Sequence, residues 1–107
     1  MGLDPGSRPI ETEKGFLAAV VDVARLYHWR VYHPYLSVRS AAGFPDLVLV
    51  KAGEPVIYAE LKRDDGRLTA AQAAWLEALR QARGTEVYCW RPADFSAIVA
   101  RLQRRRR

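Results

Sequence analysis

The chain has 107 residues, of which half are hydrophobic and 27% are charged, a composition typical of one globular domain. Its apolar runs reach only about five residues, far below the roughly 18 needed to span a bilayer, so we expect no membrane contact. The single cysteine excludes an internal disulfide, and the chain has too few cysteines and histidines for a cysteine-rich zinc site. The first nine residues carry no apolar signal segment, which predicts an intracellular protein.

The net charge of +5 and the isoelectric point near 9.8 favour an acidic partner such as a nucleic acid. The arginine run at residues 104–107 supplies four of these charges, so the rest of the chain is nearly neutral. We expect this run to be a basic C-terminal tail that either contacts phosphate or keeps the protein in solution. Arginine greatly outnumbers lysine in this chain, which sets Lys62 apart.

The first half of the chain predicts one helix followed by three strands. Residues 1–9, rich in glycine and proline, are expected to be a flexible lead to a single domain at 10–103. Helical spacing of apolar residues predicts a helix that starts near 10–12 and ends near 27. Residues 29–32 predict a short strand and 36–44 a loop. Two further strands, at 47–51 and 56–62, are joined by a turn containing glycine and proline, which predicts an antiparallel hairpin.

The second half predicts a helix, a strand and a last helix. Thr69 is suited to cap a helix that runs to about Arg83, and Gly84 is suited to end it in a left-handed conformation. Residues 85–90 are rich in strand-forming types. Pro92 suits the first turn of a final helix at 93–103. The expected order is α-β-β-β-α-β-α, an α/β domain without internal repeats.

Three charged residues lie at the ends of the predicted hairpin. Asp46 opens the apolar run of one strand, and Glu60 and Lys62 end the other. Because side chains alternate along a strand, Glu60 and Lys62 point to the same face, roughly 6–7 Å apart. Two carboxylates and an amine in one place can hold a divalent cation and activate water for phosphodiester hydrolysis. Taken singly, Asp46 is also a common turn residue, and the other two could form an ion pair on a solvated sheet edge.

Two polar residues fall on apolar helix faces. Glu13 shares its face with Phe16 and other apolar residues, so we expect it to point toward the core, although a first-turn carboxylate also stabilises the helix dipole. Gln72 lies in the middle of an apolar stripe and needs a polar partner there, either in a capping box with Thr69 or in a functional site. His28 and His33 are expected to be solvated or helix-terminal. Core positions are predicted for Trp75 and Trp90, and either a core or an interface position for Trp29.

The Gly-Phe-Pro-Asp-Leu at 43–47, the Glu-Leu-Lys at 60–62 and the Gly-Arg-Leu-Thr at 66–69 followed by Gln72 together resemble the VRR-NUC branch of the PD-(D/E)XK nuclease superfamily. The resemblance covers residues 13–90. It implies a restriction-endonuclease-like fold, with a mixed central sheet flanked by helices. It also implies Mg²⁺- or Mn²⁺-dependent cleavage of DNA.

The resemblance also implies roles for individual residues. Asp46 and Glu60 would be metal ligands together with the backbone carbonyl of Leu61, and Glu13 would complete the metal site. Lys62 would orient or deprotonate the attacking water, and Gln72 would support the site from the next helix. Apart from the resemblance, the arginines predicted to contact DNA are Arg39, Arg63, Arg67, Arg104 and Arg105, with a plain surface position as the alternative for Arg39.

Stand-alone members of this branch, including phage-encoded ones, look like junction-resolving enzymes that act as symmetric dimers. The resemblance therefore implies a homodimer acting on branched DNA such as a Holliday junction, in a prokaryotic cytoplasm or encoded by a phage. Two alternatives stay open at this point. One is a non-catalytic DNA-binding or assembly module with the same fold, and the other is a nuclease for RNA, flaps or sequence-specific duplex sites.

Overall fold

The computed structural model describes residues 10–34 and 41–104. The expected lead at 1–9, most of the expected loop at 36–44 and the last three arginines lie outside these residues. The elements are α1 (Glu13–Leu26), β1 (Arg30–Tyr32), β2 (Leu47–Val50), β3 (Val56–Leu61), α2 (Ala70–Gln81), β4 (Thr85–Trp90), a 3₁₀ turn (Pro92–Asp94) and α3 (Phe95–Gln103). The predicted order α-β-β-β-α-β-α is confirmed. In the part of the chain that is described, no helix combines the length and apolar character needed to cross a bilayer.

The four strands form one mixed sheet in the order β1-β2-β3-β4. β1 pairs with β2 and β2 with β3 in antiparallel fashion, which confirms the predicted hairpin. β3 and β4 are parallel, because α2 carries the chain back across the sheet between them. This mixed sheet with helices on both faces is compatible with a restriction-endonuclease-like fold.

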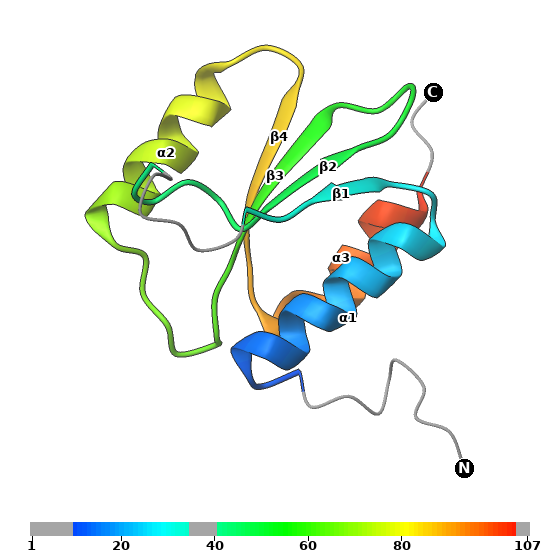
Figure 1. Ribbon diagram of the computed structural model, residues 1–107, viewed down its shortest axis with the longest axis horizontal. Helices are drawn as coiled ribbons and strands as arrows, with labels where there is room; N and C mark the ends of the chain where they lie inside the picture. Colours follow the sequence, from blue (N-terminus) through cyan, green and yellow to red (C-terminus); the bar gives the residue numbers. More distant parts are fainter. Residues whose placement is uncertain (1–9, 35–40, 105–107) are drawn as a thin grey trace.

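Helices cover both faces of the sheet, with α1 and α3 together on one side and α2 on the other (Figure 1). The main core lies on the side of α1 and α3, where alternating residues of β2 and β3 point inward. Its largest buried members include Phe16, Val20, Leu47, Leu49, Ile57, Ile98 and Leu102. Trp90 belongs to this core as predicted, and Trp29 takes the first of its two expected positions, in the core. Trp75 is only half-buried and packs edge-on against Phe44 on the side of α2.

Local hydrogen bonds set the ends of the helices. Thr12 caps α1 by accepting from the backbone N–H of Gly15 at 3.0 Å. α2 ends at Gln81, so the predicted end near Arg83 was wrong. Ala82 is extended there, and the hydroxyl of Thr85 lies 2.8 Å from the carbonyl of Leu79, one of the last in the helix. Gly84 has the predicted positive φ of 75°, but it shapes the turn into β4 and does not end the helix directly.

A buried charge cluster holds the hairpin turn, β4 and α3 together. Arg101 on α3 lies 2.9 Å from Glu54 in the β2–β3 turn and 2.7 Å from Glu86 on β4. Its guanidinium also lies over the ring of Trp29. Burial alone would lower the pKa of Arg101, but hydrogen bonds to Glu86 and Glu54 raise it above its usual value. The cluster fixes the end of the hairpin opposite to Asp46 and Glu60.

Candidate active site

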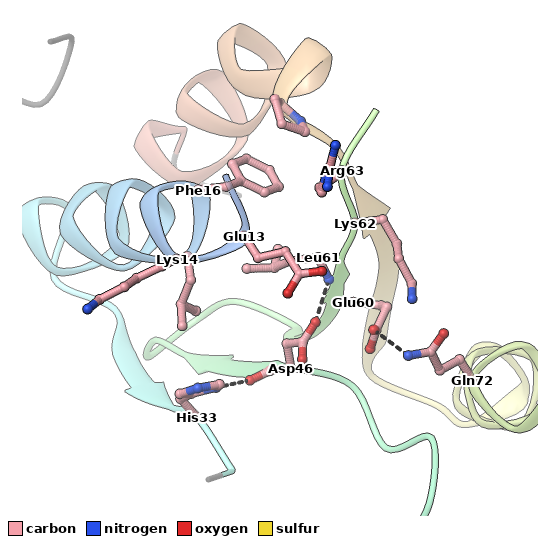
Figure 2. A pocket seen from close by; sticks show the side chains of 12 residues that line it. Glu13, Lys14, Phe16, His33, Asp46, Glu60, Leu61, Lys62, Arg63 and Gln72 are labelled. Atoms are coloured by element: carbon pink, nitrogen blue, oxygen red, sulfur yellow. Dashed lines mark hydrogen bonds between the residues drawn. The ribbon is translucent and has the colours of Figure 1, made fainter. Parts of the chain in front are cut away.

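The register of β2 and β3 places Asp46 and Glu60 next to each other. Leu47 pairs with Ala59, and the register between the two strands is regular. Continued by one residue before Leu47, this register sets Asp46 opposite Glu60. Directly opposed residues of an antiparallel pair share a face of the sheet. The two carboxyl groups therefore lie on the same side at the end of the hairpin, and both point into one site (Figure 2).

Asp46 is held from two sides by hydrogen bonds. Its Oδ2 accepts from the backbone N–H of Leu61 at 2.8 Å, and its backbone carbonyl lies 2.7 Å from Nδ1 of His33. Because a carbonyl oxygen only accepts, Nδ1 of His33 carries the proton. In an extended strand the N–H and C=O of one residue point to the same edge, so the carbonyl of Leu61 is also expected on the side of Asp46. Asp46 is thus fixed in the site and is not an ordinary turn residue.

Glu60 is a buried carboxyl group without enough partners. It is 3% exposed, its Oε2 accepts from Gln72 Nε2 at 2.9 Å, and its Oε1 is buried with no hydrogen-bond partner among the described residues. Burial, and after it the negative charge of Asp46, raises the pKa of Glu60 to about 8. The interpretation of Glu60 as half of a solvated surface ion pair was therefore wrong.

Gln72 forms the predicted capping box and also contacts the candidate site. Its Oε1 accepts from the backbone N–H of Thr69 at 2.9 Å and completes a capping box at the start of α2. Its Nε2 donates to Glu60. The cap fixes the rotamer that brings the amide to the carboxyl group.

Gly43 brings the loop before Asp46 into contact with the first turn of α2. It has a φ of +86°, and a Cβ added there would lie 2.5 Å from the backbone carbonyl carbon of Ala71. Gly43→Ala is therefore expected to push α2 and Gln72 away from Glu60 and to lower the free energy of unfolding by roughly 2 kcal/mol or more. Thermal unfolding measures this, with Gly53→Ala as control, because Gly53 has a similar φ of +81° but nothing within 4 Å of the added Cβ. Equal losses in the two variants would contradict the contact.

Glu13 and Lys62 complete the site from opposite sides. Glu13 is exposed, so the prediction that it faces the core was wrong; the core ends one turn later, at Phe16, and the first turn of α1 opens onto a cavity. Its carboxyl group points toward Asp46 and Leu61, whereas the amine of Lys62 lies on the side of Glu60 and Gln72 (Figure 2). Lys62 follows β3 directly, and its backbone N–H bonds to the carbonyl of Trp90.

A cavity of about 440 Å³ gathers all six residues proposed for metal binding and catalysis: Glu13, Asp46, Glu60, Leu61, Lys62 and Gln72. Among the predicted DNA contacts, Arg63 also lines this cavity, while Arg67 and Arg104 are exposed elsewhere. Arg39 and Arg105 lie outside the described residues. The structure thus brings together residues that are far apart in the sequence, from α1, from the residue before β2, from the end of β3 and the residue after it, and from α2.

The donor atoms of the site fit a hard divalent cation. No group of three or more histidine, cysteine or acidic side chains in the described ranges is close enough to form a ready-made metal cluster. Mg²⁺, however, typically binds through one or two carboxylates and takes its remaining ligands from water and phosphate. Asp46 and Glu60 supply such a pair. Oε1 of Glu60 is buried without a hydrogen-bond partner in the described part of the chain, and a bound cation would compensate its negative charge when Glu60 is ionised.

Two residues at the site were missed in the sequence. His33, expected to be solvated, is half-buried against Asp46, whereas His28 is exposed at the end of α1 as expected. Arg91 donates from Nη1 to the carbonyls of Arg63 at 2.6 Å and Gly66 at 2.7 Å, which fixes the connection behind Lys62. The parallel pairing of β3 with β4 was a signal for Arg91, because residues that follow the ends of paired parallel strands become neighbours.

A comparison with protein-family models matches residues 14–91 to the VRR-NUC domain. The matched segment runs from α1 to the end of β4 and includes Asp46, Glu60, Lys62 and Gln72, and it starts one residue after Glu13. Searches of curated proteins and of solved structures gave no match.

Proposed function

Because the chain belongs to the VRR-NUC domain family, a nuclease family, we propose that it is a divalent-metal-dependent endonuclease that hydrolyses DNA phosphodiester bonds. The observation that carries this proposal is the pair of adjacent carboxyl groups of Asp46 and Glu60, one of which has a buried oxygen without a partner. A lysine stands in the same cavity. A domain that only binds DNA has no use for this combination.

In this proposal the carboxylates of Asp46 and Glu60 and the carbonyl of Leu61 would hold Mg²⁺ or Mn²⁺, with Glu13 at the edge of the site. The cation, when bound, polarises the phosphate and lowers the pKa of a nearby water molecule. Gln72 occupies Oε2 of Glu60, which leaves Oε1 to coordinate. The hydrogen bond from Leu61 to Oδ2 of Asp46 keeps that carboxylate turned toward its neighbour.

Lys62 acts on the water and on the phosphate. Its ammonium orients the attacking water and offsets negative charge on the pentacovalent phosphorus. The water gives up a proton to solvent as its oxygen forms the new bond to phosphorus, the bond to the leaving deoxyribose oxygen breaks, and that oxygen takes up a proton from solvent. Arg91 holds the backbone that follows Lys62, so it serves as a positioning residue.

The test is a cleavage assay with labelled four-way junction, flap, duplex and single-stranded DNA and single-stranded RNA, each with Mg²⁺, Mn²⁺ or EDTA. We expect cutting of DNA in either metal and none in EDTA. Branched substrates should be cut faster than uninterrupted duplex. Binding without cleavage of any substrate would instead identify a non-catalytic module.

We further propose a homodimer, because one small domain has little surface with which to grip a branched substrate. A two-fold dimer would place two cavities against two strands. Light scattering with and without a four-way junction measures the mass in solution. A monomeric mass in both samples would contradict the dimer and leave the nuclease proposal intact.

A further inference from the structure

A second groove continues from the candidate active site. It has a volume of about 600 Å³, lies between α1 and β1, and shares Lys14, Leu17 and His33 with the first cavity. We call it the α1–β1 groove; its other lining residues are Ala18, Val21, Asp22, Arg25, Val31 and Tyr32. We propose that this groove holds an unpaired nucleic-acid strand beside the scissile phosphate. The inference rests on the proposed nuclease function and names the substrate class of the same site.

Cationic residues mark the two ends of the groove along α1. Lys14 and Arg25 are eleven positions apart, so at 1.5 Å per residue they are about 16 Å apart along the axis and, at 3.6 residues per turn, on nearly the same face. Both are exposed. Lys14 extends away from the acidic cluster toward which its neighbour Glu13 points (Figure 2). Two cations at this distance suit phosphates several nucleotides apart on one strand.

The floor of the groove is apolar. Leu17, Ala18 and Val21 follow one another along α1, and Val31 faces them from β1. An apolar floor between cationic ends matches a ligand that carries both flat apolar faces and negative charges. A double helix hides the faces of its bases by stacking and pairing, whereas an unpaired strand exposes them. The volume also lies in the range of pockets for small ligands, the size of a nucleotide or two.

Tyr32 supplies an aromatic side chain at the groove. It ends β1, is 62% exposed and immediately precedes His33, which lines both cavities. Exposed tyrosines provide stacking surfaces for unpaired bases, regardless of their sequence. Asp22 also lines the groove, so its middle attracts phosphate less than its two ends do. The arrangement favours bases over the middle and phosphates at the ends.

Binding measured in EDTA, where no cutting is expected, tests this proposal. Fluorescence anisotropy is recorded for a short thymidine strand, a short uridine strand, an abasic strand and a duplex. Tyr32→Ala is expected to weaken binding of the thymidine and uridine strands about tenfold and to leave the abasic strand and the duplex unchanged. Equal losses for both base-bearing strands mean that the groove accepts DNA and RNA alike, and a loss for one of them alone means that it discriminates between thymidine and uridine strands. The matched control is Leu26→Ala, because Leu26 is a 65% exposed apolar residue of α1 outside the lining of both cavities.

The cationic end is tested by salt dependence. Arg25→Ala is expected to reduce the slope of log affinity against log salt for the thymidine strand by about one, and Arg83→Ala, an exposed arginine outside the groove, to leave it unchanged. The proposal that the groove holds an unpaired strand would be overturned by either of two results. One is that Tyr32→Ala and Arg25→Ala bind with the same affinity as their controls. The other is that their affinity for duplex falls as much as their affinity for single strands. This failure is separate from that of the nuclease proposal, which is decided by metal-dependent cutting with the unaltered protein.

Discussion

Lys62→Met is expected to lower the single-turnover rate of metal-dependent DNA cleavage by about a thousandfold or more, while the affinity for DNA stays within a few-fold. The methionine keeps the length and the apolar stem of the side chain but removes the ammonium, which the proposal assigns to the attacking water and the phosphorus. An interaction made mainly in the transition state affects the rate more than binding. Rates are measured with Mg²⁺ and Mn²⁺ at saturating enzyme.

The matched control is Lys51→Met, which removes a half-buried lysine that bonds to the carbonyl of Tyr27 at 2.8 Å and does not line the cavity. This variant should cut at nearly the rate of the unaltered protein. A Lys62→Met protein that is folded and cuts within tenfold of the unaltered rate would contradict the assigned role of Lys62.

Glu60→Gln is expected to stabilise the metal-free protein at alkaline pH. The pKa of Glu60 is about 8 in the folded state, against an ordinary value of 4.5 that applies to the unfolded chain. The folded state therefore binds the proton more tightly. Protonated Glu60 therefore contributes to the free energy of unfolding. This contribution is fully present below pH 4.5 and is lost as the pH rises through about 8. Glutamine mimics the protonated acid at every pH, so the variant should exceed the unaltered protein by on the order of 3 kcal/mol at about pH 9 and by under about 1 kcal/mol at about pH 5.

Urea unfolding in EDTA at the two pH values measures this difference. Glu77→Gln, at an exposed glutamate on α2, is the control and should show no such pH dependence. Mn²⁺ added at about pH 8 should stabilise the unaltered protein and have little effect on Glu60→Gln. A difference between Glu60→Gln and the unaltered protein that does not change with pH would contradict the buried, proton-holding state of Glu60.

The secondary structure could be predicted from apolar spacing because local periods decide it. The hairpin and the position of Glu60 and Lys62 at its end could be predicted from alternation along strands alone. The pairing of Asp46 with Glu60 needed the register as well, and the short turn between the strands restricts that register strongly. Gln72 could be predicted because an amide in an apolar stripe needs a partner.

The remaining features depend on long-range packing that a single sequence does not contain. Glu13 has the helical position of a core residue, but it is exposed and lines the cavity at the first turn of α1. His33 contacts Asp46 only because β1 joins the sheet beside β2, a pairing that no local pattern specifies. Trp75 was expected in the core because it is large and apolar, yet α2 lies alone on its face of the sheet and Trp75 is only half-buried there, against Phe44.

The central claim, that Asp46 and Glu60 together form a divalent-metal site, is tested most directly by titrating Mn²⁺ into the protein and measuring the heat of binding near pH 8. The account predicts one or two Mn²⁺ ions bound per chain, an affinity at least about tenfold weaker in Asp46→Asn and in Glu60→Gln, and no change in Glu77→Gln. Mn²⁺ affinity equal to that of the unaltered protein in both site variants, together with DNA cleavage that persists in EDTA, would contradict it.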